Sequence, residues 1–294
     1  MSRLQVAENQ WAILAFSMAD PSLNEDLPFR HYTLKHRLIA WISIHLFDGV
    51  SYTVRHGLLQ GLKRKGGLGW LPGMFASGVE TPESRFWKEL DLKGLTVYDI
   101  GAFHGLLALF FASRAAKVVC FEPNAGNYKR LMENLALNGF RNVSVRKTGV
   151  GSRREMLKMA VNPLMPGGSS VDARMVEKMR RSPDTVVEEV SIVTLDEEIR
   201  EANLPAPDFI KIDIEGWEIE ALRGARQTLV AYKPALFLEM HGESIREKKQ
   251  KVAEIVAFLW EINYRNILSI ETGTPITLEN TLVAMEGHLY CKAR

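Results

Sequence analysis

The sequence predicts an α/β fold built on a parallel sheet with crossover helices. Between Leu95 and Leu238, short apolar runs recur, separated by amphipathic stretches of helical length, a pattern typical of parallel strands joined by helices. Acidic residues close three of these runs, at the edge where such sheets bind ligands. The expected strands are Val97 to Ile100, Val118 to Phe121, Val143 to Val145, Phe209 to Ile214 and Ala235 to Leu238.

The residues before the first strand have a different character. Helical patches at 11–18 and 34–47 alternate with prolines and with the glycine-rich stretch 66–69. Pro82 then leads into a short helix through Leu90. We therefore divide the chain into an N-terminal helical extension, residues 1–92, and an α/β domain, residues 93–294.

Two helices of the α/β domain are indicated by their apolar spacing. The first is capped by Asn124 and ends at Asn138 and Gly139. Its apolar positions are Tyr128, Leu131, Met132 and Leu135, and those of the second are Val252, Ile255, Val256 and Leu259. The stretch from Asn162 to Ser182 is rich in proline and glycine, and we expect an insertion or mobile loop there, near the ligand side of the sheet.

Composition is that of an ordinary globular protein. The chain has 294 residues, 46% hydrophobic and 24% charged, and a formal charge of +2, so no whole-molecule field favours nucleic acid or membrane. The two cysteines, Cys120 and Cys291, stand far apart in apolar contexts, which favours a reduced protein. The N-terminus lacks the pattern of a signal peptide, and we expect a cytoplasmic location.

The ends of the first two strands carry a candidate nucleoside site. Asp99 lies within the end of the first strand and is followed by Gly101 and Gly105, which allow a turn to approach a ligand closely. This Gly-x-x-x-Gly spacing departs from the dinucleotide fingerprint, so a ligand with an amino-acid moiety fits better than a pyrophosphate. Glu122 ends the second strand, where a carboxylate can accept both hydroxyls of a ribose.

These motifs, with several later ones, resemble the FkbM family of methyltransferases over roughly residues 95–265. The segments that carry the resemblance are Val97 to Gly105, Phe121 to Asn124 with Asn127, Asn134 and Asn138, Val190 to Asp196, and Phe209 to Gly216 with Gly224 and Ala225. The resemblance implies a class I, Rossmann-like fold: a seven-stranded, mostly parallel sheet with helices on both faces, binding S-adenosylmethionine at the strand ends. The implied cofactor residues are Asp99, Gly101, Ala102 and Gly105 around the methionine part, Glu122 and Pro123 at the ribose, Val150 near the adenine, and Asp213.

Methyl transfer to a hydroxyl requires a group that removes a proton as the oxygen attacks. Asp213 and Glu215 close the fourth strand, and Glu239 and His241 the fifth, so these side chains can share one pocket. His241 is the leading candidate for the base. Alternatively, the four groups bind a divalent ion such as Mg²⁺, or Glu215 caps the following helix. Trp217 either lines the acceptor site or belongs to the core.

The favoured function is O-methylation of a saccharide, polyketide or other small-molecule acceptor, with no required metal. One alternative is a nucleic-acid methyltransferase, but the fourth strand ends in Ile-Asp-Ile-Glu rather than a motif suited to a base amine, and no basic groove is evident. Another is a non-catalytic cofactor-binding or scaffold protein. Basic residues at 35–37 and 63–65 could meet an anionic membrane face, although scattered solvated charge explains them too. The sequence leaves the oligomeric state open.

Overall fold

A computed structural model describes most of the α/β domain and part of the region before it. The described residues are 42, 46–66, 80–162, 169–182, 184–242, 244–285 and 287–294. The helical patch at 11–18, most of the patch at 34–47 and the basic residues 35–37 lie outside them. The same holds for residues 67–79 and 163–168.

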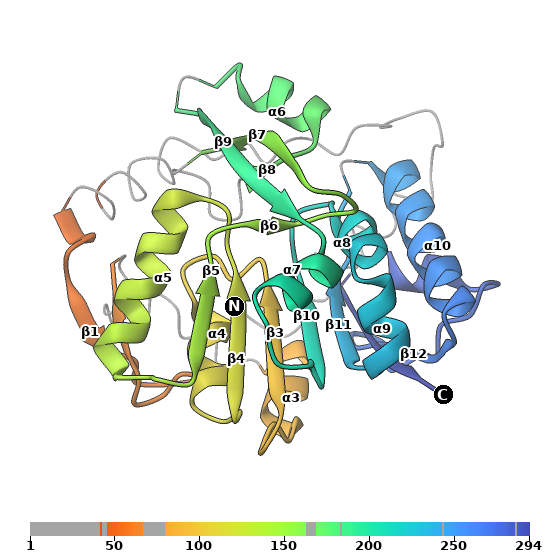
Figure 1. The fold of residues 1–294 in the computed structure, drawn as a ribbon, viewed down its shortest axis with the longest axis horizontal. Helices are drawn as coiled ribbons and strands as arrows, with labels where there is room; N and C mark the ends of the chain where they lie inside the picture. The colour runs from red at the N-terminus through yellow and green to blue at the C-terminus, as the bar shows by residue number, and fades with distance from the viewer. Residues whose placement is uncertain are drawn as a thin grey trace, which may run out of the picture.

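The core is a seven-stranded sheet in the order β12-β13-β11-β10-β3-β4-β5 (Figure 1). The parallel strands are β3 (Thr96–Ile100), β4 (Lys117–Phe121), β5 (Val143–Arg146), β10 (Phe209–Ile212) and β11 (Ala235–Glu239). Strands β12 (Tyr264–Ser269) and β13 (His288–Ala293) complete the edge beside β11, and β13 runs antiparallel to both of its neighbours, β11 and β12. The chain winds outward from β3 in one direction and from β10 in the other. Their shared carboxyl ends are therefore the topological switch point where ligands bind in such sheets.

Helices cover both faces of this sheet, as expected. Tyr98 and Ile100 of β3 pack on one side with residues of the later helices, whereas Val97 packs on the other side with the earlier ones. The first layer contains α7 (Leu195–Glu201), α8 (Glu218–Gly224), α9 (Arg226–Tyr232) and α10 (Ile245–Glu261). The second contains α3 (Pro82–Glu89), α4 (Leu106–Ala112) and α5 (Ala125–Asn138). The predicted cap of α5 is confirmed, because the Asn124 side chain accepts from the backbone of Asn127 and Gly139 ends the helix at φ 67°.

A second, four-stranded sheet lies above the central sheet in Figure 1. Its strands are β6 (Gly149–Val150), β7 (Glu155–Val161), β8 (Ser169–Ser170) and β9 (Val186–Val193), and α6 (Ala173–Met179) lies beside it. The expected loop at 162–182 is therefore wrong over 169–179. Asp172 caps α6 there, and Val176 and Met179 bury their side chains against Ala160. The proline and glycine that favoured a loop are confined to 163–168.

The region before the central sheet contains a hairpin as well as a helix. Strands β1 (Ser51–Thr53) and β2 (Lys63–Lys65) pair antiparallel, so the predicted helical character of residues 1–92 is wrong for this stretch. Helix α3 forms where expected, and its Trp87 is 1% exposed, packed 4.2 Å from the ring of Phe237. Helix α3 is thus part of the packed core, while the boundary at residue 92 stays a prediction.

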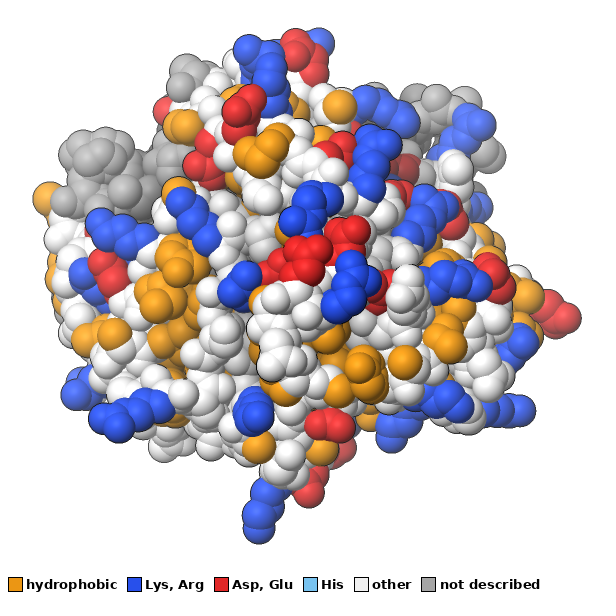
Figure 2. All heavy atoms as spheres, in the orientation of Figure 1, with side chains coloured by type: hydrophobic (Ala, Val, Ile, Leu, Met, Phe, Trp, Pro, Cys, Tyr) orange, Lys and Arg blue, Asp and Glu red, His pale blue; other side chains and the backbone are white. Residues whose placement is uncertain are grey.

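The nearly balanced charge of the sequence is visible on the surface. Figure 2 shows Lys and Arg side chains interspersed with Asp and Glu over the face in view. Within the part of the chain that the structure describes, no helix is both long and apolar enough to cross a membrane. Cys120 and Cys291 are buried free thiols.

Candidate cofactor and acceptor site

A tight turn, residues 101–105, joins β3 to α4, and we call it the glycine loop. Gly101 and Gly105 have φ of 82° and 87°, in the region that L side chains rarely adopt. A Cβ at Gly101 would overlap the backbone oxygen of Asp213, and one at Gly105 would lie 2.5 Å from Leu131 Cδ1. Both positions need glycine because the loop passes directly against β10's end and against α5.

Glu122 is fixed at the end of β4 by three donors. Its Oε2 accepts from the Phe103 backbone N–H at 2.8 Å, and its Oε1 accepts from the Asn124 N–H at 2.9 Å and Asn127 Nδ2 at 3.3 Å. Burial raises the pKa of Glu122 to about 7, while these donors oppose the rise. These donors occupy three of the carboxylate's roughly four lone-pair sites, which leaves one on Oε2 for a ligand hydroxyl.

A cavity of about 170 Å³ opens at the carboxyl ends of β3, β4 and β10, beneath the second sheet. Six predicted residues line it: Gly101, Glu122, Pro123, Val150, Asp213 and Glu215. Trp217 also lines it, which favours the acceptor-site interpretation over the core one. Three other predicted cofactor residues, Asp99, Ala102 and Gly105, do not line it. They are buried behind the glycine loop's surface and shape it from within.

Lys211 is the buried cation that pairs with the buried carboxylate of Asp99. Lys211 Nζ lies 3.2 Å from a carboxylate oxygen of Asp99 and 3.2 Å from one of Asp213, and it donates to the Gly101 carbonyl at 2.9 Å. Burial alone would lower the pKa of Lys211, but Asp213 and Asp99 raise it above its usual value. A buried cation therefore ties the ends of β3 and β10 to the glycine loop.

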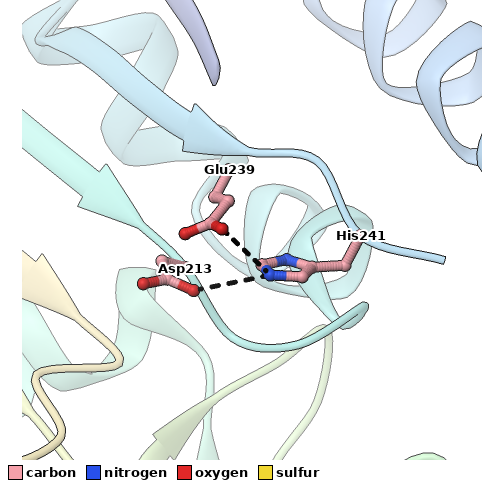
Figure 3. A group of neighbouring side chains, drawn as sticks. All are labelled: Asp213, Glu239 and His241. Carbon is pink, nitrogen blue, oxygen red and sulfur yellow. Dashed lines mark ion pairs between the residues drawn. The ribbon is translucent and has the colours of Figure 1, made fainter. Parts of the chain in front are cut away.

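Four side chains converge beside the cavity, and we call them the acid–imidazole cluster: Asp213, Glu215, Glu239 and His241. His241 Nε2 lies 3.4 Å from Glu239, 3.6 Å from Glu215 and 3.9 Å from Asp213. Figure 3 shows Asp213 and Glu239 pointing at the same edge of the ring. The four side chains do lie close together, as predicted, but strand alternation does not bring all of them there. Strand β10 ends at Ile212, and Glu215 reaches the cluster from a turn at φ 53° rather than by strand alternation.

Glu218, the first residue of α8, orients the imidazole from behind. Its Oε1 lies 2.9 Å from His241 Nδ1 and also accepts from the Gly216 N–H at 2.9 Å. Glu218 therefore has the helix-start role considered for Glu215. Burial would lower the pKa of His241, but hydrogen bonds to Glu218 and Glu239 raise it to about 11. In this arrangement His241 is a cation at neutral pH.

The carboxylates of the cluster differ in their charge states. Burial raises the pKa of Glu215 to about 7, with His241 opposing. Burial also acts to raise the pKa of Glu239, but hydrogen bonds from His241 and His288 lower it overall. His288 in turn lies 2.6 Å from Glu271, and these partners raise its pKa to about 9 against burial. Glu215 is thus the carboxylate that titrates near neutrality.

A divalent cation is sterically compatible with part of the cluster. One ligand atom from each of Asp213, Glu239 and His241 lies within 4.8 Å of the others. Carboxylate oxygens and an imidazole are suitable ligands, and a carboxylate behind the imidazole is a common supporting partner. The same distances are also satisfied by a protonated His241, so geometry alone does not require a metal.

The sequence analysis assigned no role in the site to Glu218, Lys211 or Asn127, although Asn127 belongs to the motifs that carry the family resemblance. A lysine within the apolar run Phe209 to Ile212 was a usable signal, because a buried lysine requires an anionic partner. Glu218 follows a Gly-Trp pair at a helix start, where an acid is ordinarily a cap. Its contact with His241, 23 positions away, is a tertiary event.

The chain is similar in sequence to known methyltransferases. The model of the methyltransferase FkbM domain matches residues 99–266, more than half of the chain. Methyltransferase sdnD of Sordaria araneosa is 29% identical over 153 residues, which cover 44% of this chain and 59% of that protein. Hexuronic acid methyltransferase AglP of Haloferax volcanii is 26% identical over 149 residues, covering 50% of this chain and 56% of that protein. The chain thus matches less than two thirds of the length of these relatives.

Solved structures show weaker likeness. A methyltransferase FkbM from Methylobacillus flagellatus KT has a TM-score of 0.45 and 20% identity, with 74% of this chain and 46% of that chain covered. A putative methyltransferase from Streptococcus mutans in complex with SAH has a TM-score of 0.43 and 12% identity, with 74% and 99% covered.

Proposed function

The chain belongs to the FkbM methyltransferase family, and from that premise we propose that it transfers a methyl group from S-adenosylmethionine to a hydroxyl of a saccharide, polyketide or other small-molecule acceptor. One observation carries the proposal. The cavity lined by Gly101 and Phe103 of the glycine loop and by Glu122 is also lined by Asp213 and Glu215 of the acid–imidazole cluster, so candidate proton-transfer groups adjoin the candidate nucleoside site. The fold and cavity support the donor more strongly than the acceptor.

The residues present fit S-adenosylmethionine. Gly101 lines the cavity and lets the glycine loop pass against the end of β10, where a Cβ would overlap the Asp213 backbone oxygen, and Glu122 offers a fixed, buried acceptor for a ribose hydroxyl. Val150 and Pro123 also line the cavity and supply apolar contacts suited to the adenine. Lys211 stabilises the loop from beneath through the Gly101 carbonyl.

When bound, the cofactor supplies an electrophilic methyl group on a sulfonium, so the protein must position the acceptor oxygen and take its proton. We propose that the acid–imidazole cluster acts as one coupled unit. His241, anchored by Glu218, orients the surrounding carboxylates as a cation. Glu215, with a pKa of about 7, is then the group best matched to accept a proton near neutrality. His241 itself can act as the base only after losing the proton that Glu218 and Glu239 stabilise.

Calorimetric titration with S-adenosylmethionine and with NAD(P) tests the donor. We expect micromolar binding of S-adenosylmethionine only. Binding of NAD(P) without S-adenosylmethionine would overturn the assignment. A screen of saccharide and polyketide alcohols with labelled methyl donor, read by product mass, tests the acceptor class. Comparing Glu215→Gln with His241→Gln on the accepted alcohol then assigns the base, since the true base loses more kcat while both retain cofactor affinity.

We propose that the reaction needs no metal, because a protonated His241 already neutralises part of the charge of its carboxylate neighbours. A non-catalytic binding role remains the alternative from another functional class, and turnover discriminates it. Product formation with any hydroxyl acceptor excludes a purely binding role.

A further inference from the structure

One buried face of α5 lies along the glycine loop. Asn127, Leu131 and Asn134, spaced i, i+4 and i+7, share this face. Asn127 donates to Glu122, Leu131 packs where a side chain at Gly105 would clash, and Asn134 Nδ2 donates to the His104 carbonyl at 2.8 Å. Helix α5 therefore supports the loop directly through Leu131 and Asn134, and through Glu122 from Asn127.

The glycine loop needs such support because its backbone is strained. Phe103 is a non-glycine residue in the left-handed region, at φ 49°, between two glycines that also have positive φ. Its N–H is held by Glu122, and the next carbonyl, that of His104, is held by Asn134. Glu122 is the expected ribose ligand, so cofactor contacts and loop geometry depend on the same short segment.

The opposite end of the Asn134 amide binds the β1–β2 hairpin. Asn134 Oδ1 accepts from the Lys65 N–H at 2.8 Å, and Asn138 both accepts from the Lys63 N–H and donates to the Lys63 carbonyl, each at 2.8 Å. These two asparagines, one turn apart, bind the open edge of β2 as a neighbouring strand would. Lys65 Nζ also lies 3.2 Å from Glu133. Figure 1 shows β1 and its hairpin beside α5.

Asn134 is completely buried and uses both ends of its amide, one on the hairpin and one on the glycine loop. Asn138 binds the hairpin equally well but makes no contact with the loop in the described residues. The hairpin lies outside the region matched by the family model. We propose that Asn134 is a positioning residue that couples docking of this hairpin to the affinity of the cofactor site. The proposal rests on the proposed function only in naming the ligand.

The two asparagines offer a matched pair of variants. Calorimetry with S-adenosylhomocysteine should show about 10-fold weaker binding for Asn134→Ala, the size of an ordinary coupling between sites. Asn138→Ala should bind within about 2-fold of wild type, on the same scale. Melting temperatures measured in parallel remove the effect of general destabilisation, because both variants lose hairpin contacts. Equal affinities for the two variants would overturn the proposal.

Hydrogen exchange of wild-type protein tests the coupling in the reverse direction, and it remains available if Asn134→Ala does not fold. Because coupling is reciprocal, saturating S-adenosylhomocysteine should slow exchange of the Lys63 and Lys65 amides. Unchanged exchange there, with the ligand bound, would contradict the proposal.

A failure of the proposed function is separable from a failure of this proposal. If wild-type protein does not bind the ligand, the proposed cofactor is wrong. The role of Asn134 is then decided without ligand. Exchange at the amides of Phe103 and Gly105 should be faster in Asn134→Ala than in Asn138→Ala, and equal rates would refute it.

Discussion

Replacing Glu122 with glutamine should weaken S-adenosylmethionine binding by roughly 100-fold. The carboxylate has one free lone-pair site, on Oε2, and a charged hydrogen bond from a ribose hydroxyl there contributes about 1.5–3 kcal/mol. A neutral amide in that place loses about 1–2 kcal/mol of it. A second effect adds to this loss. Both oxygens already accept backbone N–H groups, from Phe103 and Asn124, so a glutamine NH₂ must oppose one of these donors, at a cost of about 1–3 kcal/mol. At about 1.4 kcal/mol for each tenfold change, the two losses together correspond to roughly 100-fold.

Isothermal calorimetry measures this loss, and Glu188→Gln is the matched control. Glu188 accepts from the Asn124 side chain, in the same network, but does not line the cavity. Its variant should bind within about 2-fold of wild type, because it makes no ligand contact. A ligand that lacks the 2′-hydroxyl completes a double-mutant-type cycle. The loss of affinity caused by Glu122→Gln should be smaller for this ligand than for S-adenosylmethionine. A loss below about 5-fold, or an equal loss for the 2′-deoxy ligand, would refute the ribose assignment.

The pKa of Glu122 gives the same prediction a pH dependence. Burial raises that pKa to about 7, and the ribose requires the ionised form. Affinity should therefore be constant above pH 8 and fall as pH drops through 7. At pH 6 only about a tenth of the molecules are competent, so binding should be about 10-fold weaker. A flat profile between pH 6 and 8 in wild type would show that Glu122 is already ionised throughout.

Four further predictions concern the charged groups around the cavity. Lys211→Met leaves Asp99 buried without its cation and should lower the free energy of unfolding by about 3–5 kcal/mol in urea titrations; a loss under about 1 kcal/mol would contradict a stabilising pair. Glu218→Gln should lower the pKa of His241 by about 1–3 units, measured by NMR titration of the imidazole, and an unmoved titration would show that Glu218 does not hold its proton. In wild type the folded pKa of His241, about 11, exceeds its unfolded value of about 6.5. The contribution of His241 to the free energy of unfolding is therefore fully present below pH 6.5 and is lost as pH rises toward 11. His241→Gln should make the melting temperature depend less on pH over this range. Finally, EDTA should leave methyl transfer unchanged, whereas a loss restored by Mg²⁺ or Mn²⁺ would assign a metal to the acid–imidazole cluster.

Much of the central fold was predictable because short stretches of sequence indicate its strands and helix ends. The apolar runs at Val97 and Val118 form β3 and β4, and α5 begins after Asn124 and ends at Gly139, as expected. The insertion was less predictable. Its prolines and glycines obscured α6, whose only clear start signal was Asp172. The hairpin was missed for a related reason, since each of its strands has only three residues.

The sequence by itself determined where the glycine loop and the strand-end acids would be. Both follow from short stretches of sequence, because an apolar run marks where a strand ends and the glycines after it allow a turn with positive φ. Only the tertiary structure decided which groups those acids would meet. Lys211 reaches the Gly101 carbonyl across 110 positions, and Glu218 reaches His241 across 23. Burial and these distant partners set the charge states, so His241, chosen from its ordinary pKa, is held as a cation. Asn134 likewise binds two segments, the β1–β2 hairpin at Lys65 and the glycine loop at His104, that only folding brings beside α5.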